Sequence, residues 1–148
     1  MKKAYKIAVA FALLIIFAAF MFYQLVLYPS YVKDYSISQV CSSPQAFNNF
    51  HVRLQGYIMH TSYMFGPAFV LRNFNYDGAE IGIAGKGQAI VNGFNLTQYV
   101  SFEQNHSGEM IQVNNTKVTV VGHVHYWGAR TDAPTFDLDI EEVSAQSP

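Results

Sequence analysis

The chain has 148 residues, of which 51% are hydrophobic and 13% charged, and its formal net charge at pH 7 is −1. This length holds one domain of ordinary size together with an anchoring segment. Beyond residue 28 there are six basic and ten acidic side chains, a net charge of −4. A surface of that sign repels a phosphate backbone, which argues against nucleic acid as a partner.

An uncharged apolar segment dominates the N-terminal part of the chain. Residues 7–28 form a run of 22 residues without a charge. At a rise of about 1.5 Å per residue, a helix of this length spans roughly 33 Å, enough to cross a bilayer's hydrocarbon core. A secretory signal peptide is the alternative, but its apolar core is usually about 7–15 residues long and leads into a small-x-small cleavage site. We therefore predict that residues 1–28 are a cytoplasmic tip and a retained transmembrane helix, which contacts the lipid bilayer.

The charges that flank this segment predict its orientation. Three basic residues precede it: Lys2, Lys3 and Lys6. Just beyond it, Lys33 and Asp34 cancel. Because Lys and Arg are retained preferentially in the cytoplasm, we expect a single-pass protein of the cell membrane with its C-terminal domain extracytoplasmic. Three N-x-[ST] sequons, which are glycosylated only on exported chains, agree with this orientation. They begin at Asn95, Asn105 and Asn114.

The segment after the anchor is predicted to begin with a stalk. Residues 29–49 are assigned to this stalk and to a short helical turn near residues 36–40. Cys41 is the single cysteine, so the chain forms no internal disulfide, and we expect its thiol to be buried. Alternation of apolar and polar side chains then predicts a first strand over residues 51–59 and a second over 68–74.

Three further strands complete the predicted domain. The third is expected over residues 79–84, the fourth over 116–127 and the fifth over 135–143. Residues 88–115, between the third and fourth strands, are rich in Asn and Gly and predict an irregular insert with a helix over 96–103. Residues 144–148 are predicted to be a frayed tail.

Two of these strands carry the same pattern around a glycine, VRLQGYI over residues 52–58 and VTVVGHV over residues 118–124. A glycine inside a strand indicates a bulge or a sharp bend. The pattern resembles the paired strands of OB-fold proteins, which bend at such glycines so that the barrel closes. The resemblance covers residues 38–143 and implies an all-β domain, a five-stranded Greek-key barrel of the OB type over residues 50–143. A β-sandwich is the alternative, but it requires about seven strands.

A membrane anchor followed by an exported OB barrel also resembles the haem chaperone of cytochrome c maturation. That family binds haem through a His-x-x-x-Tyr or Cys-x-x-x-Tyr motif after the last barrel strand. This chain has neither: four residues after His123 comes Trp127, and four residues after Cys41 comes Gln45. The resemblance therefore implies the architecture and carries no haem-binding residue to this chain.

His123 and His125 are the best candidates for metal ligands. Residues i and i+2 of a strand share one face, so both imidazoles can reach one ion. His60 is a third candidate, although simple alternation puts it on the inward face unless Gly56 introduces a bulge. The metal would be copper or zinc, and no other cofactor is predicted. The alternative is a metal-free outer face of polar and aromatic side chains, since tetrahedral zinc usually requires three or four protein ligands.

No nucleophile with a base, no paired carboxylates in a motif and no phosphate-binding loop can be recognised, so we do not expect an enzyme. Aromatic residues are enriched at protein interfaces, and three of them are candidates here: Tyr57, Tyr126 and Trp127. The sequence therefore predicts a non-catalytic accessory subunit or assembly factor of a membrane protein complex. Two alternatives remain open, a metal or haem carrier for exported enzymes and a cell-surface module that binds glycans.

Overall fold

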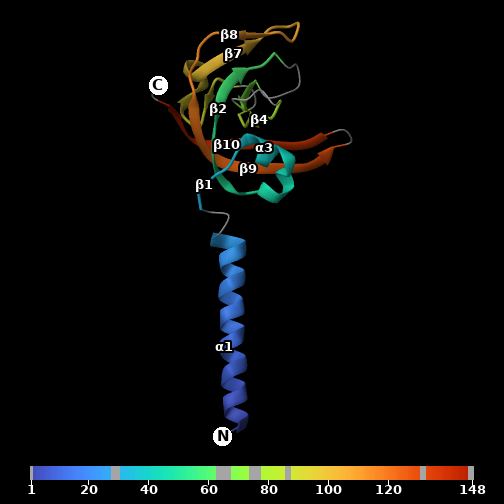
Figure 1. Ribbon diagram of the computed structural model, residues 1–148, viewed down its shortest axis with the longest axis vertical. Helices are drawn as coiled ribbons and strands as arrows, with labels where there is room; N and C mark the ends of the chain where they lie inside the picture. Colours follow the sequence, from blue (N-terminus) through green and yellow to red (C-terminus); the bar gives the residue numbers. More distant parts are fainter. Residues whose placement is uncertain are drawn as a thin grey trace. The chain divides into compact units, whose positions relative to one another are not determined.

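The computed structural model describes residues 2–27, 31–62, 68–73, 78–85, 88–130 and 133–146 (Figure 1). It divides into two compact units, Met1–Tyr31 and Val32–Pro148. The first unit is helical, and the second consists mainly of strands. A mostly β domain preceded by one apolar helix, as the sequence predicts, is confirmed.

The N-terminal unit is one apolar helix. Helix α1 (Lys2–Phe22) continues into the π-helical turn η1 (Tyr23–Leu27). The stretch Tyr5–Leu27 has 23 residues and a mean hydropathy of 2.5, and none of its most apolar window is buried. At about 1.5 Å per residue it is roughly 35 Å long. It is therefore long and apolar enough to cross a membrane.

Five strands of the second unit pair into a closed ring. They are β2 (His51–His60), β3 (Phe69–Arg72), β4 (Glu80–Ile83), β9 (Val118–Arg130) and β10 (Ala133–Ala145). β2 pairs antiparallel with β3, and β3 with β4; β4 pairs parallel with β10, β10 antiparallel with β9, and β9 antiparallel with β2. All five predicted strands are present, although residue 74, predicted to end the second, lies outside the described residues.

The inward-facing side chains of the ring form one apolar core. Val52, Leu54 and Ile58 of β2 are fully buried. They meet buried residues of the other ring strands, among them Leu71, Ile81, Val120, Val124, Leu138 and Ile140. Removing this apolar surface from water is the main stabilising contribution to such a domain.

Two short elements, which lie in sequence between the apolar helix and β2, support the ring. β1 (Lys33–Asp34) pairs parallel with β2. Helix α3 (Ile37–Ser42) follows, where the sequence predicts a helical turn, and it buries Ile37 and Val40 in the core. A 3-10 turn, η2 (Pro44–Phe47), then leads into β2.

The two strand glycines allow close approach of neighbouring backbones. A Cβ atom at Gly56 would collide with the carbonyl oxygen of Arg72 on β3. A Cβ atom at Gly122 would collide with the carbonyl oxygen of Asp139 on β10. The two positions therefore require glycine because the backbone of the next strand occupies the side-chain space.

The insert after β4 contains more strand than the sequence predicts. A small hairpin of β5 (Ile90–Val91) and β6 (Phe94–Asn95) turns through Asn92 and Gly93, both with positive φ. The helix predicted over residues 96–103 is wrong beyond residue 99. The 3-10 turn η3 (Leu96–Tyr99) ends there, and β7 (Val100–Gln104) begins.

β7 is a strand because its pairing and packing outweigh local preference. It pairs parallel with β2 and antiparallel with β8 (Met110–Gln112), which lies at the edge of the sheet. Phe102 of β7 packs with Met59 and Val70 in a second, smaller core. These contacts come from residues distant in sequence, which explains why local patterning missed β7 and β8.

β9 and β10 continue beyond the ring as a two-stranded arm, here defined as residues 126–130 and 133–136 (Figure 1). In the described part of the chain, the strand pairing of these residues is only between the two strands of the arm, from Tyr126 with Phe136 to Arg130 with Ala133.

Two register shifts interrupt the β9–β10 ladder. The first leaves Trp127 as an extra residue on β9, and the second leaves Glu141 as an extra residue on β10. Such bulges re-aim side chains.

Candidate functional site

Two histidines face each other on the outer side of the ring. His51 is the first residue of β2, and His123 lies directly opposite it on β9. Their neighbours Val52 and Val124 point inward and are buried, so alternation turns both imidazoles outward. The rings stack at 4.3 Å between centroids, with 11° between their planes. The strand ladder therefore fixes the distance between the two side chains.

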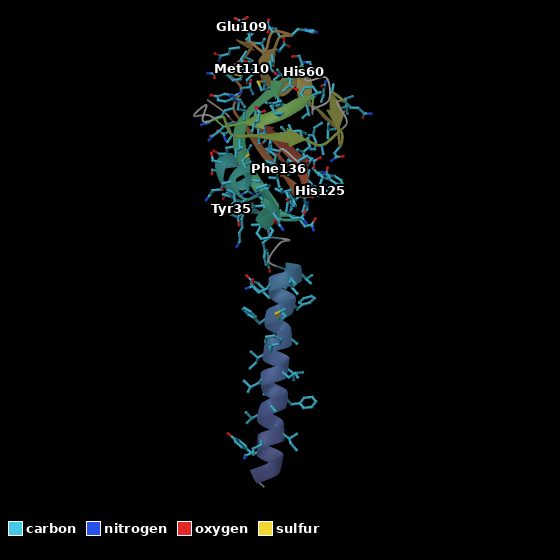
Figure 2. The ribbon with its side chains drawn as sticks, turned by 90° about the vertical axis from the view of Figure 1, so that its right-hand side faces the viewer. Tyr35, His60, Glu109, Met110, His125 and Phe136 are labelled. Carbon is cyan, nitrogen blue, oxygen red and sulfur yellow. The ribbon has the colours of Figure 1, made fainter. Side chains whose placement is uncertain are left out.

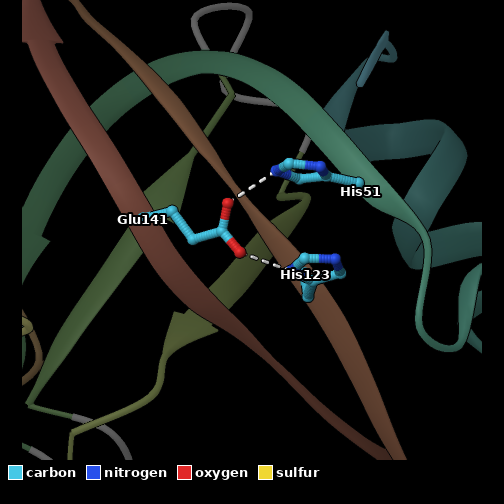
Figure 3. Close-up of side chains that lie close together, drawn as sticks. All are labelled: His51, His123 and Glu141. Carbon is cyan, nitrogen blue, oxygen red and sulfur yellow. Dashed lines mark ion pairs between the residues drawn. The ribbon is translucent and has the colours of Figure 1, made fainter. Parts of the chain in front are cut away.

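Glu141 connects the two rings from the third strand. Its carboxylate Oε2 lies 2.7 Å from Nε2 of His51, and its Oε1 lies 2.7 Å from Nδ1 of His123 (Figure 3). Ile140 is buried, so regular alternation turns Glu141 outward. Because Glu141 is the extra residue of the bulge, no residue of β9 lies directly opposite it. The group of His51, His123 and Glu141 therefore draws one residue from each of β2, β9 and β10.

The group is partly sheltered and open on one side. The side chain of His51 is 17% exposed and that of His123 is 35% exposed, whereas that of Glu141 is 47% exposed. Each residue offers one ligand atom, and these three atoms all lie within 4.8 Å of one another. Among the described residues, this is the group of at least three His, Cys, Asp or Glu side chains that is close enough to hold one metal ion.

A second polar pair lies further along the same two strands. Nδ1 of His125 lies 3.9 Å from Oδ1 of Asp137, its partner across the ladder. The indole of Trp127 meets the imidazole of His125 edge to face, at 5.9 Å between centroids. Burial raises the pKa of Asp137 and nearby Asp139 adds to this, while a hydrogen bond from Trp127 and the charge of His125 oppose it.

The predicted metal ligands are only partly brought together. His123 belongs to the three-residue group, and His125 lies beside it but pairs with Asp137. His60 lies at the other end of β2, with its ring 5.0 Å from that of Phe69, and Figure 2 places it in a different part of the domain from His125. The alternation of β2 continues through its register with β3, so His60 lies opposite Phe69 on the face of Ile58. Met59 points to the other face, where the second core buries it. His60 is exposed because it is the last residue of β2.

Sequence reasoning missed His51 and Glu141. The alternating pattern predicts His51 only as the start of a strand, and its position opposite His123 follows from the register of β2 with β9, which local pattern does not encode. Glu141 lies in an alternating acidic run that is typical of a solvated face. Its position beside the two histidines depends on the register of β10 with β9.

The three candidate interface residues differ in exposure. Tyr57 is half-buried against Phe102, at 5.5 Å between ring centroids. Tyr126 is half-buried and, together with the segment from Ser42 to Ala46, lines a hollow of about 470 Å³. Trp127 is 68% exposed. Trp127 is therefore the one of the three that presents a large aromatic surface to solvent.

The sequon asparagines and the cysteine lie on or near the surface. Asn95 and Asn114 are exposed, and Asn105 is half-buried. The side-chain oxygen of Asn95 accepts a hydrogen bond from the backbone of Thr97, and that of Asn105 accepts one from the backbone of Ser107. Cys41 is half-buried rather than fully buried, and its thiol donates to the carbonyl oxygen of Glu80 at 3.3 Å.

Two imidazoles and one carboxylate can bind a cation or exchange protons, and an exposed indole can fill a pocket of another protein. The imidazole–carboxylate group lies on β2, β9 and β10 of the ring, and the indole lies on the arm that extends β9 and β10. Fold alone does not decide between these functions, which have to be argued from the site.

No family model, no curated protein and no solved structure matches this chain.

Proposed function

We propose that this chain is a membrane-anchored, extracytoplasmic barrel module of the OB type that acts as a non-catalytic accessory subunit or assembly factor of a membrane protein complex. The observation that carries this proposal is the arm of β9 and β10, which extends beyond the ring and holds Trp127 68% exposed.

The order of pairing around the ring supports the OB assignment. The first ring strand, β2, pairs with both the second, β3, and the fourth, β9. The third strand, β4, pairs parallel with the fifth, β10, and this pairing closes the ring. A five-stranded Greek-key barrel of the OB type has this connectivity. The glycines of β2 and β9 lie where strands approach most closely, which agrees with sharply bent barrel strands.

The proposed placement rests on the apolar helix and on the charges beside it. The helix is long enough for one span, and its N-terminal flank carries the basic residues. With the N-terminus in the cytoplasm, the β domain lies outside. Asn95 and Asn114 are exposed, which would leave both sequons accessible on an exported domain.

The arm has the properties of a docking element. The base of the arm is held by the domain, because Phe136 packs against the core and the backbone N–H of Tyr126 donates to Oδ1 of Asn48. Further out the two strands pair with each other, and an isolated two-stranded ribbon is only marginally stable in water, so this part of the arm gains stability from a partner. Trp is enriched among the residues that contribute most to binding. The domain's net charge is −4, and Asp137 and Asp139 lie beside the arm. We therefore propose a partner protein at the membrane that presents a basic surface with an aromatic-accepting pocket.

A metal carrier for exported enzymes is the second candidate, and the group of His51, His123 and Glu141 favours it. The haem version has no matching residues in this chain. The glycan-binding alternative depends on aromatic residues of the second and third strands. Phe69 is 4% exposed, and Phe65, Phe74 and Tyr76 lie outside the described residues, so this alternative stays a prediction.

Extraction of the full-length chain from its native membranes in mild detergent, followed by quantitative mass spectrometry, tests the accessory role. We expect membrane proteins to co-purify at a fixed ratio and to be lost in Trp127→Ala. Ile111→Ser is the matched control, because Ile111 is 48% exposed but lies on β8, which β2 and β7 separate from β9. A solitary chain, or partners retained equally by both variants, contradicts the proposal.

A further inference from the structure

We infer that His51, His123 and Glu141 form a binding site for one divalent transition metal ion, with Zn²⁺ as the representative ion. This site differs from the one that the sequence predicts, because it contains neither His125 nor His60. It is also independent of the docking role proposed above, since Trp127 is not part of it.

The ligand chemistry selects the class of metal. Imidazole nitrogen suits zinc, copper, nickel and iron, whereas calcium and magnesium prefer an all-oxygen environment. Two imidazoles with one carboxylate are a set that holds zinc in other proteins, with a fourth position left open. Copper(II) should bind the same ligands more tightly than zinc, as the general order of divalent affinities requires.

The geometry requires little adjustment to accept the ion. Ligand atoms about 2.1 Å from a tetrahedral ion lie roughly 3.4 Å apart. The carboxylate oxygens of Glu141 lie 2.7 Å from each imidazole nitrogen, so the carboxylate has to withdraw by less than about 1 Å. Glu141 is the most exposed of the three and has rotatable bonds to do so. The paired strands hold the backbones of the two histidines. Their stacked rings have to turn so that the two planes converge, because an imidazole nitrogen binds an ion in the plane of its ring.

The charge balance also favours a bound cation. Glu141 brings one negative charge to the group, and each imidazole coordinates an ion as a neutral ligand. Asp139 and Asp137 lie on the same strand, and the domain as a whole is acidic. A divalent ion allows both imidazoles to stay neutral and compensates the carboxylate at the same time.

Neighbouring acidic side chains have other partners. The carboxylate of Asp139 accepts a hydrogen bond from the amide of Asn92 at 2.9 Å, and Asp137 lies beside His125 and Trp127. The proposed site therefore has three protein ligands. Because three ligands leave a coordination position for water or for a donor from another molecule, the ion should exchange readily.

The test uses the full-length chain, purified in detergent and stripped with a chelator. Zn²⁺ is titrated by calorimetry, with Mg²⁺ as the negative control. We expect one Zn²⁺ per chain and no heat from Mg²⁺. His51→Ala and His123→Ala should each weaken Zn²⁺ binding by at least about 100-fold, since losing even an outer-shell partner of a metal ligand costs about 10–100-fold.

His125→Ala and Trp127→Ala are the matched controls, and both should keep the affinity of the unaltered chain. Glu141→Gln covers the case in which a histidine variant fails to fold, because it preserves shape while removing the charged ligand, and it should weaken Zn²⁺ binding. X-ray absorption of the Zn²⁺-loaded chain should count two imidazole ligands. Absence of stoichiometric binding, or equal loss in His125→Ala, would overturn the inference.

Discussion

Two extra residues, Trp127 and Glu141, determine what β9 and β10 present to solvent. Each is the unpaired residue of a bulge and has no cross-strand partner of its own. Trp127 meets His125 and remains exposed, while Glu141 bridges His51 and His123. The two bulge residues of one hairpin therefore belong to the two surface features, the arm and the three-residue group.

Asp137→Asn should change how stability depends on pH. Burial raises the folded-state pKa of Asp137 above its usual value of 3.8, so the folded chain keeps this proton after the unfolded chain has lost it. The free energy of unfolding contributed by Asp137 therefore falls as the pH rises from about 3.8 through the raised pKa. Asn removes this fall. Relative to the unaltered chain, the variant should gain stability between pH 3 and pH 7, as measured by urea unfolding at both values.

The opposite trend would contradict the burial argument for Asp137. If the variant lost stability relative to the unaltered chain as the pH rose, the hydrogen bond from Trp127 and the charge of His125 would outweigh burial. The repulsion between Asp139 and Asp137 is lost in the variant, and it raises the pKa of Asp137 in the same direction as burial.

Gly122→Ala should destabilise the domain. The added Cβ would meet the backbone carbonyl of Asp139, which is held by the β9–β10 ladder and cannot rotate away. We expect a loss of about 1–3 kcal/mol in the free energy of unfolding, the usual cost of overpacking. Ser144→Ala, at an exposed position of β10, is the control and should change stability by less than about 0.5 kcal/mol. Chemical denaturation measures both, and equal stability of the two variants would contradict the close approach of β9 and β10.

At the level of single residues, the sequence predicts one of the three members of the candidate site. His123 is recognisable because it shares an outward face with His125 on a clear strand. His51 and Glu141 are not, because their roles depend on strand register and on a bulge, which arise from long-range pairing. Simple alternation predicts His60 on the face of Ile58, and its pairing with Phe69 keeps it there, at the far end of β2 from His51.

At the level of elements, strong periodic patterns were predicted well and the insert was not. The strands with alternating Val, Leu and Ile residues lie close to their predicted positions, and α3 begins where the helical turn was expected. β7 and β8 were missed because β7 is stabilised by its pairing with β2 and by the contact of Phe102 with Met59. Such contacts override local preference for a helix.

Ser36→Ala should weaken the attachment of α3. The hydroxyl of Ser36 accepts a hydrogen bond from the backbone of Gln39 at 3.1 Å, and the side chain of Gln39 accepts one from the backbone of Ser36 at 2.8 Å. This capping box satisfies two backbone donors at the start of the helix. Its loss should reduce the free energy of unfolding by about 1 kcal/mol, and Ser36→Asp should restore most of it. The midpoint of thermal unfolding is measured for both variants and for the unaltered chain. An unchanged midpoint in Ser36→Ala would show that the cap does not stabilise the domain.

At the level of the whole molecule, the chain consists of a span-length apolar helix and a β domain with its own core. Residues 32–148 alone should therefore fold. We expect a circular dichroism spectrum dominated by strand and a cooperative thermal transition within a few degrees of that of the full-length chain in detergent, because α1 contributes no residue to the core. A non-cooperative transition, or a mainly helical spectrum, would contradict this division.

The architecture was the easiest part to predict from sequence, and the partner the hardest. Hydropathy identifies a helix long enough for a span, because a bilayer requires about 20 apolar residues in succession, and the glycine patterns of two strands point to a closed ring. The surface that meets another molecule depends on the shape and charge of that molecule as well, and one chain encodes only half of this complementarity.

Crosslinking from the arm tests whether it docks onto a protein at the membrane, as we propose. A photo-activated crosslinking residue is placed at position 127 of the full-length chain, and intact native membranes are irradiated. We expect an adduct with one membrane or exported protein, of constant mass, that does not form when the crosslinker stands at position 111. Adducts with lipid alone, no adduct, or the same adducts from both positions would contradict it.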